Sequence, residues 1–313
     1  MSNLNIKPMR DAFFERIYEL AKLDKDIVIV SADMAAPALD VFRKEFKDRF
    51  INVGISEQNA ILVAAGLALT GKKPIAYAIT QFISLRVFEQ IRIYSCGMNL
   101  PMSIVGVGAG AGYYESGPTH HIIEDISVMR TLPNLKIYNA SDQESARAFA
   151  DMAVDGIGPK YMRLDRDKIG GLHNLNEQYN TGISILGSLG TVNIITTGNM
   201  VKMALDVRDK LKDEGIKIGV ADIYRLPIDE NELFPILRSS QILVALEEHT
   251  LAGGLGSYLL EILNDNGIPM LIKRLGMDTK MGYAGCYNYG GREAIRGEFG
   301  IDMSNIIAFI KTI

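Results

Sequence analysis

Short runs of β-branched residues alternate along the chain with stretches of helical periodicity, and this alternation limits the possible folds more than any other feature. A strand, a helix and a further strand form the repeating unit of parallel sheets covered by helices. The expected strands cover residues 27–31, 50–53, 75–79, 102–107, 135–139, 192–196, 218–221, 242–247 and 271–275. The expected helices cover residues 9–23, 57–69, 83–96, 124–130, 200–214, 230–238 and 256–264. The sequence therefore predicts an α/β protein, with a turn over residues 33–37.

The alternation fades in one polar, glycine-bearing stretch, residues 165–179 (DRDKIGGLHNLNEQY). A chain of 313 residues is long enough for two domains of about 150 residues each. We therefore expect two domains, residues 1–175 and 183–313. Each is expected to contain one open sheet with flanking helices.

The composition excludes several classes of protein. Hydrophobic residues make up 48% and charged residues 22% of the chain, as in folded globular proteins. A net charge of −4 gives no basic surface for nucleic acid, and two cysteines are too few for a disulfide framework. The longest apolar run, residues 60–69, is too short to span a membrane, and the charged N-terminal stretch lacks the apolar core of a secretion signal. We expect a cytoplasmic protein without nucleic-acid or membrane partners.

The glycine-rich stretch of residues 106–112 follows a strand, as the phosphate-binding loop of a dinucleotide domain does. No helix is expected directly after it, and no acidic residue stands where a ribose partner would, so this interpretation is disfavoured. The P-loop and Gly-x-Ser-x-Gly motifs are absent. The four histidines lack the helical spacing or the thiolate neighbours of a metal site, so we expect none in this chain.

Three side chains become informative only when they are taken together. Glu57 begins an apolar helical stretch behind Ser56, which can cap the helix, and alone it is best explained as a carboxylate placed favourably on the helix dipole. Phe82 follows a strand, and alone it is best explained as a core residue. His120 ends the glycine-rich loop, where a histidine is more often a structural hydrogen-bonding group than a catalyst.

The order and spacing of these residues resemble a known family. The segments GISEQNAILVAAGLAL, GKKPIAYAITQFISLRVFEQIR, SGPTHHIIEDISVMR and LPNLKIYNASD follow one another as in the pyrimidine-binding half of transketolases. The segment EEHTLAGGLGSYLLEIL is similar to the C-terminal domain of that family. The resemblance implies the C-terminal subunit of a split transketolase, with a thiamine diphosphate-binding pyrimidine domain followed by a transketolase C-terminal-like domain. The same architecture serves the β subunit of 2-oxoacid dehydrogenases and part of deoxyxylulose-phosphate synthase.

The resemblance implies a thiamine diphosphate enzyme that is active only with a partner. In the family, a separate domain binds the diphosphate and the metal through a Gly-Asp-Gly motif and a later asparagine, and this chain has no Gly-Asp-Gly. Mg²⁺ (or Ca²⁺) is therefore expected on an N-terminal diphosphate-binding transketolase subunit. Two copies of each subunit are expected to form a two-fold α2β2 assembly. The implied reaction transfers a two-carbon ketol unit from a ketose to an aldose acceptor.

The resemblance also gives roles to individual residues. Glu57 matches the glutamate that bonds the pyrimidine ring nitrogen and favours its imino tautomer, and burial is expected to raise the pKa of this carboxyl. Phe82 matches the aromatic residue that stacks on the pyrimidine. Asp33 lies where the family has an acidic cofactor-site residue. His120 matches the histidine that faces the substrate, so Glu57 and His120 are the expected catalytic residues.

The expected substrate-binding residues are His120, Arg10, Ser116 and an arginine at the end of the first half. Arg10 matches an arginine that helps to bind the acceptor phosphate, and either Arg163 or Arg166 matches a second one. Ser116 stands where ordinary transketolases carry an aspartate that reads a hydroxyl of the sugar donor.

Other departures from the family pattern also concern the substrate. His121 stands where glutamine is usual, a phosphate-contacting histidine is replaced near Gly108, and a phosphate-contacting serine is lost near Pro37. The ketol-transfer residues are thus retained while the residues for sugar and phosphate are changed. We expect an atypical sugar as donor or acceptor.

Two alternatives remain open at this point. One is the β subunit of a 2-oxoacid dehydrogenase-type decarboxylase, which the segment GPTHH and the pair Glu248-His249 disfavour. The other is a catalytically silent scaffolding subunit, which the retained Glu57, Phe82 and His120 disfavour. The C-terminal domain is expected to support the assembly and to contribute little chemistry directly.

Overall fold

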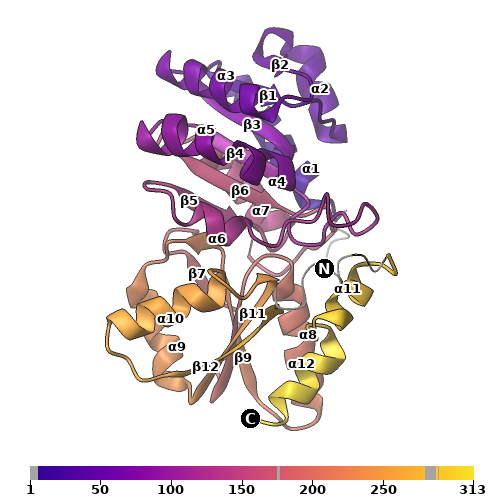
Figure 1. The fold of residues 1–313 in the computed structure, drawn as a ribbon, viewed down its shortest axis with the longest axis vertical. Coiled ribbons are helices and arrows are strands. Elements are labelled where there is room, and N and C mark those ends of the chain that lie inside the picture. The colour runs from indigo at the N-terminus through magenta and orange to yellow at the C-terminus, as the bar shows by residue number, and fades with distance from the viewer. Residues whose placement is uncertain (1–5, 175–176, 279–286, 288) are drawn as a thin grey trace. The chain divides into compact units, whose positions relative to one another are not determined.

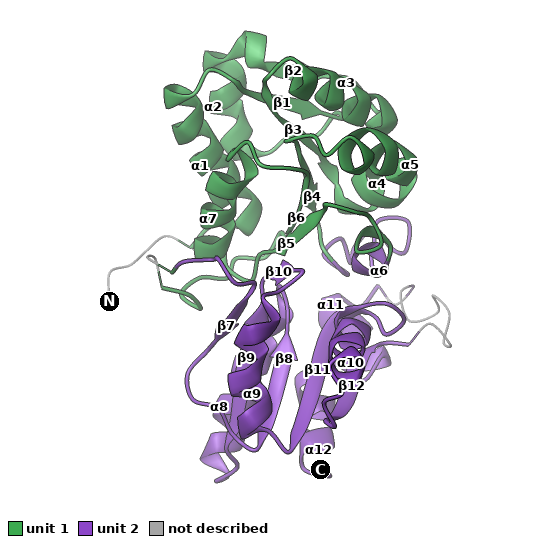
Figure 2. Ribbon diagram, turned by 90° about the vertical axis from the view of Figure 1, so that its left-hand side faces the viewer, with its two compact units in different colours: residues 1–109, 128–177 green, residues 110–127, 178–313 purple. Residues whose placement is uncertain are grey.

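The computed structural model describes residues 6–174, 177–278, 287 and 289–313. Figure 1 shows its helices and strands, and Figure 2 shows the two compact units into which the chain divides. Unit 1 comprises residues 1–109 and 128–177, and unit 2 comprises residues 110–127 and 178–313. The segment 110–127 is flanked on both sides by sequence of unit 1 but packs with unit 2.

Unit 1 is built on parallel strands. They are β1 (Ile27–Ser31), β2 (Phe50–Asn52), β3 (Lys73–Ile79), β4 (Ser103–Val107), β5 (Lys136–Asn139) and β6 (Lys160–Leu164). Their order is β5-β6-β4-β3-β1-β2, and all neighbouring pairs among them are parallel. Every residue of β1, β4 and β6 is buried, which explains the apolar runs that predicted β1 and β4. β6 has the sequence KYMRL and was not predicted, because two of its five residues are charged.

Helices cover both faces of these strands. Figure 2 shows α1 (Met9–Leu23), α2 (Pro37–Glu45) and α7 (Gln143–Ala153) on one face and α3 (Glu57–Leu69) on the other. The predicted bounds of α1 and α3 match the observed ones, whereas α2 begins at Pro37, where a turn was expected. Proline fits the first turn of a helix because its missing N–H would have no intrahelical partner there.

A broken helical segment lies beside α3. It consists of α4 (Thr80–Ser84), the 3₁₀ turn η2 (Leu85–Val87), α5 (Phe88–Gln90) and the π-helical η3 (Ile91–Gly97), where the sequence predicted one helix. A Cβ at Gly106 of β4 would lie 2.9 Å from the Cα of Thr80. Glycine at this position therefore allows the first turn of the segment to lie directly against the strand.

Unit 2 has its own sheet of five strands. They are β7 (Ile183–Ile185), β8 (Val192–Thr196), β9 (Ile218–Ile223), β11 (Ile242–Thr250) and β12 (Leu271–Met277). The order is β12-β11-β8-β9-β7, with β7 antiparallel to β9 and the other pairs parallel. The remaining elements are β10 (Arg225–Leu226), α8 (Met200–Asp213), η4 (Glu230–Leu233), α9 (Phe234–Ser239), α10 (Leu255–Asp265), α11 (Arg292–Glu298) and α12 (Met303–Ile310). The fold class is confirmed: each half contains a sheet with flanking helices.

The core of unit 2 explains why the segment 110–127 belongs to it. Ala111 and Ile123 from this segment are buried in one cluster with Met200 of α8, Val244 of β11 and Ile295 of α11. The cluster also includes apolar residues of β8, β9 and α12. The short helix α6 (Asp125–Met129) follows and leads the chain back to unit 1.

Candidate active site

Glu57 is the first residue of α3, directly after the short strand β2 and a turn. The residue is buried, with 3% of its surface exposed, and its Oε2 accepts a hydrogen bond from Nη1 of Arg86 at 2.9 Å. Ser56 occupies the N-cap position, but its hydroxyl donates to the carbonyl of Val53 at 3.2 Å and makes no cap bond. Ser56 is therefore the N-cap residue as predicted, but the expected side-chain capping bond is absent.

Phe82 lies on α4, within the broken helical segment. The guanidinium carbon of Arg86 is 4.2 Å from the centroid of the Phe82 ring, a distance typical of a cation–π contact. One arginine thus contacts both residues that the sequence singled out for the pyrimidine. Sequence reasoning missed this arginine, since Arg86 is separated from Glu57 by 29 positions; its only signal is the four-residue spacing from Phe82.

Asp33 follows β1 and is exposed. Its φ of 54° is left-handed, a conformation that aspartate tolerates better than most residues. Its backbone N–H donates to Oδ1 of Asn52 at 3.1 Å, and Nδ2 of Asn52 lies 3.2 Å from its Oδ1. These bonds hold Asp33 at the carboxyl ends of β1 and β2, where open α/β sheets place ligand-binding residues.

The candidate arginines differ in their surroundings. Arg10, on α1, pairs with its neighbour Asp11 at 2.9 Å. Arg163 lies in β6, is only 4% exposed, and donates to Oδ1 of Asn139 at 3.4 Å. Arg166 follows β6 and is half-buried. The structure therefore distinguishes a buried Arg163 from a more accessible Arg166, while the role of each stays a prediction.

The loop residues Ser116, His120 and His121 belong to unit 2, whereas Glu57 and Phe82 belong to unit 1. Ser116 is exposed and His120 is half-buried, and Nδ1 of His120 lies 2.9 Å from the Thr119 hydroxyl. His121 is 4% exposed, and burial lowers the pKa of its imidazole. A proton on His121 is therefore disfavoured in the folded chain.

A second buried carboxylate, Glu248 at the end of β11, was not predicted as a site residue. Arg292 Nη2 and Arg296 Nε each bond it at 2.7 Å. Burial alone would raise the pKa of Glu248, but the two arginines outweigh that effect and hold the pKa well below its usual range. Sequence reasoning had no pattern for this cluster, because the arginines are 44 and 48 positions away.

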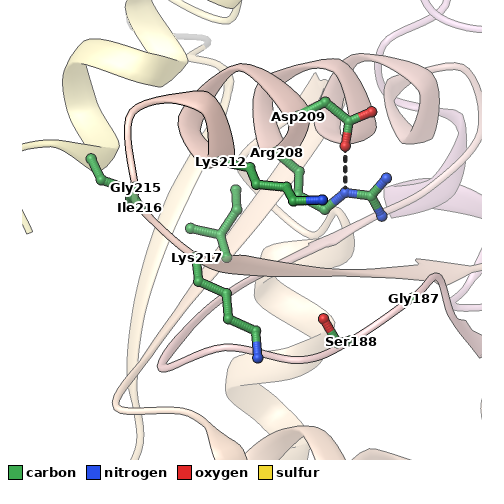
Figure 3. Close-up of a pocket in the computed structure, with 9 residues that line it drawn as sticks. Gly187, Ser188, Arg208, Asp209, Lys212, Gly215, Ile216 and Lys217 are labelled. Atoms are coloured by element: carbon green, nitrogen blue, oxygen red, sulfur yellow. Dashed lines mark hydrogen bonds and ion pairs between the residues drawn. The ribbon is translucent and has the colours of Figure 1, made fainter.

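Unit 2 has a hollow of about 430 Å³, and Figure 3 shows the residues that line it. Arg208, Lys212 and Lys217 line it, and none of the predicted site residues does. Arg208 pairs with Asp209 at 2.9 Å, and Lys212 lies in the last turn of α8, where a cation complements the helix dipole. Arg208 and Lys212 are therefore explained as surface groups of α8.

Two features are absent from the residues that the structure describes. Among them, no group of three or more His, Cys, Asp or Glu side chains could hold a metal ion. No helix in this part of the chain is long and apolar enough to cross a membrane.

Comparison with known proteins identifies the family of both halves. Residues 7–170 match the transketolase pyrimidine binding domain, and residues 186–290 match the transketolase C-terminal domain. The chain belongs to the transketolase family. Membership implies thiamine diphosphate as the cofactor, as the resemblance in sequence indicated. The pyrimidine-domain match contains Glu57, Phe82 and His120.

Full-length relatives are themselves subunits. A subunit of the apulose-4-phosphate transketolase of Actinobacillus succinogenes is 33% identical over 306 residues, covering 97% of each chain. The 6-deoxy-6-sulfo-D-fructose transketolase subunit SqwH of a Clostridium species is 32% identical over 302 residues, covering 96% of this chain and 92% of the relative. The predicted membership in split transketolases is confirmed.

Solved transketolases have the same fold. A split-gene transketolase, described as an inactive β4 tetramer, has a TM-score of 0.87 and 30% identity and covers 98% of each chain. The transketolase of Campylobacter jejuni has a TM-score of 0.78 at 18% identity, and this chain matches 48% of its length. The latter likeness concerns the fold alone.

Proposed function

We propose that this chain is the pyrimidine-binding subunit of a two-component transketolase, which transfers a two-carbon ketol unit from a ketose to an aldose acceptor. Family membership and full-length relatives that are named transketolase subunits support the proposal. The observation that carries it is the cluster of Glu57, Phe82 and Arg86. It places a buried carboxylate and an aromatic ring around one planar, nitrogen-bearing group.

The cluster fits the aminopyrimidine of thiamine diphosphate. The guanidinium of Arg86 is planar, stacks over the Phe82 ring and bonds the Glu57 carboxylate, so these two side chains accommodate a flat nitrogen-bearing group between them. Glu57 would bond the pyrimidine ring nitrogen and exchange a proton with it, and Phe82 would fix the plane of the ring. The cofactor supplies the carbon nucleophile that makes and breaks the bond next to the carbonyl. Asp33 is the third proposed cofactor-binding residue.

The diphosphate and the metal require a second chain. No Gly-Asp-Gly occurs in the sequence, so we assign Mg²⁺ (or Ca²⁺) and the diphosphate to an N-terminal transketolase subunit. The inactive β4 tetramer of the split-gene relative is consistent with a subunit that cannot act alone. We propose an α2β2 assembly of two-fold symmetry in the cytoplasm.

The substrate is proposed to be an atypical sugar. Ser116 cannot accept hydrogen bonds as the charged aspartate of ordinary transketolases does, so donor recognition is expected to change at this position. His120 would face the substrate, and Arg10 with Arg163 would bind an anionic group such as a phosphate or sulfonate. The sugars in the names of two relatives, apulose-4-phosphate and 6-deoxy-6-sulfo-D-fructose, carry a phosphate and a sulfonate group.

The proposal is tested by ketol transfer with purified components. The full chain is mixed with a diphosphate-binding transketolase subunit, thiamine diphosphate and Mg²⁺, and is offered ketose donors with phosphate, sulfonate or no anionic group. We expect turnover only when both chains are present. Cofactor binding without turnover on any sugar would contradict the proposal and favour a decarboxylase β subunit or a silent subunit.

A further inference from the structure

The carboxyl end of β11 carries four consecutive buried polar residues, 247–250 (EEHT). Polar groups that are buried without partners are costly. The side chains of Glu247, Glu248 and His249 are all hydrogen-bonded, whereas the hydroxyl of Thr250 is not, and Thr250 acts through its backbone. Glu247 accepts the backbone N–H groups of Leu255 at 2.7 Å and Gly256 at 3.0 Å, at the start of α10. Its three neighbours instead contact the segment 110–127.

Glu248 holds the beginning of that segment. Its Oε1 accepts the backbone N–H of Ala111 at 2.7 Å, while Arg292 and Arg296 fix the same carboxylate from the side of α11. Gly110 has a φ of +60°, and a Cβ there would collide with the Glu248 carboxylate. The close approach of backbone and carboxylate therefore requires glycine at this position.

His249 and Thr250 hold the end of the segment. Nε2 of His249 accepts the backbone N–H of Ile126 at 3.1 Å, so Nδ1 must carry the proton, and it donates to the Thr250 carbonyl at 2.9 Å. The backbone N–H of Thr250 donates to the carbonyl of Ile123 at 2.7 Å. Adjacent residues of one strand thus fix both ends of the segment.

Between these two anchors the segment closes on itself. The N–H of Ile122 donates to the carbonyl of Gly110 at 2.9 Å, and the N–H of His120 donates to the carbonyl of Gly117 at 3.0 Å. The Thr119 hydroxyl lies 2.9 Å from Nδ1 of His120 and limits the rotation of the imidazole. His120 is therefore carried by a short closed loop whose position depends on β11.

We propose that Glu248 is a positioning residue that acts through this loop to hold the imidazole of His120 in place for ketol transfer, an inference that rests on the proposed function. Stability alone does not account for the cluster, because a buried ion cluster is often no more stable than apolar side chains of the same volume. A fixed position for a group that faces the substrate is the benefit that such a cluster provides. Unit 2 then contributes to the chemistry and not only to the assembly.

The anchoring is tested first by amide hydrogen exchange on the full chain. Glu248→Gln keeps the size of the side chain and removes the charge that two arginines share, so exchange at residues 111–122 is expected to rise roughly tenfold. Glu247→Gln, an equally buried neighbour on the same strand, is the matched control. It is expected to speed exchange at the start of α10 and leave residues 111–122 within about twofold. Unchanged exchange at 111–122 in Glu248→Gln overturns the proposal.

If Glu248→Gln does not fold, a second variant, Arg292→Lys, tests the same anchoring. Arg292→Lys keeps the positive charge but loses the bidentate fork, so a smaller acceleration over the same residues is expected. Faster hydrogen exchange elsewhere, with exchange at residues 111–122 unchanged, would contradict the proposed anchoring of the loop.

The connection to His120 is tested by a double-mutant cycle in the assembled enzyme. Glu248→Gln is expected to lower kcat about 10- to 100-fold, as a displaced catalytic group does, with thiamine diphosphate affinity changed less than about twofold. In a His120→Ala background the same change should have no further effect, since its effect passes through His120. Additive losses would overturn the positioning role. Absence of ketol transfer in the wild-type assembly would instead reject the proposed function, and the exchange experiment would still decide the anchor.

Discussion

Two glutamates of this chain are buried to the same degree and pair with arginine, yet their partners differ. The side chain of Glu57 is 4% exposed and that of Glu248 is 3% exposed. Arg86, which pairs with Glu57, is 47% exposed, whereas Arg292 and Arg296 are 7% and 8% exposed. The ion pair in unit 1 therefore reaches solvent through its arginine, and the cluster in unit 2 does not.

This difference decides what each carboxylate can do. Arg86 regains hydration when it leaves Glu57, so exchanging it for another planar nitrogen-bearing group requires little free energy. Loss of the Glu248 carboxylate would remove a buried ion-pair partner from both Arg292 and Arg296, although Arg296 also pairs with Glu293. An exchangeable partner suits a ligand-binding site, and a fixed cluster suits a scaffold that holds a loop.

The largest expected effect is on turnover and comes from Glu57→Gln. The amide retains the shape of the side chain but cannot exchange a proton with the pyrimidine, so kcat should fall about 10²- to 10⁴-fold. Initial rates of the assembled enzyme measure this, with the thermal midpoint as a check on folding. Glu89→Gln, at an exposed position of α5, is the control and should retain wild-type turnover. More than a tenth of the wild-type rate in Glu57→Gln would remove Glu57 from the chemistry.

The largest expected effect on stability comes from Arg292→Met. Without Arg292, Glu248 keeps Arg296 and the Ala111 N–H but loses several charge-assisted hydrogen bonds in a buried position, which lowers the free energy of unfolding by about 2–4 kcal/mol. Urea unfolding of the full chain, followed by circular dichroism, measures the loss. A loss below about 1 kcal/mol would mean that the cluster behaves like a surface ion pair, and the contrast with Glu57 would disappear.

The sequence predicted the elements whose signal is local. The apolar run 60–69 follows the polar residues 56–59, and the predicted bounds 57–69 equal those of α3. The run 83–96 was predicted as one helix, but in the structure it is divided among α4, η2, α5 and the π-helical η3. Periodicity does not show where the backbone changes from one helical type to another. α7 was missed although Asp142 and Ser145 form a capping box, since that pattern is weaker than the usual one ending in Glu or Gln.

The candidate site was predictable only through motifs. Glu57 and Phe82 were found because they occupy recognisable positions in a family pattern, and the structure then placed Arg86 against both. The role of Glu248 could not be predicted, because its backbone partner Ala111 lies 137 positions away and a backbone N–H has no sequence signature. A contact between residues so far apart in sequence depends on the topology of unit 2, which the local pattern of the sequence does not reveal.

A smaller effect is expected from pH, through His121. Burial lowers the pKa of this imidazole below its ordinary value of about 6.5, so the unfolded chain binds more protons in that range. The free energy of unfolding should therefore fall as the pH drops below about 6.5, by at most about 1.4 kcal/mol per pH unit from this group. His121→Gln should remove that part of the slope. Urea midpoints at several pH values check it, and equal slopes in both proteins would exclude His121 as the cause.

The smallest effect is expected from Arg86→Met, the counterpart of Arg292→Met in unit 1. Methionine keeps an apolar contact with Phe82, the lost guanidinium is half-exposed, and the N-terminus of α3 still favours the negative charge of the buried Glu57, so the free energy of unfolding should fall by no more than about 1 kcal/mol. The same urea experiment measures both variants under one set of conditions. A loss as large as that of Arg292→Met would make the pair at Glu57 a fixed scaffold, and a carboxylate so held could not serve a cofactor. A small loss leaves the partner of Glu57 free to be exchanged, as the proposed cofactor site requires.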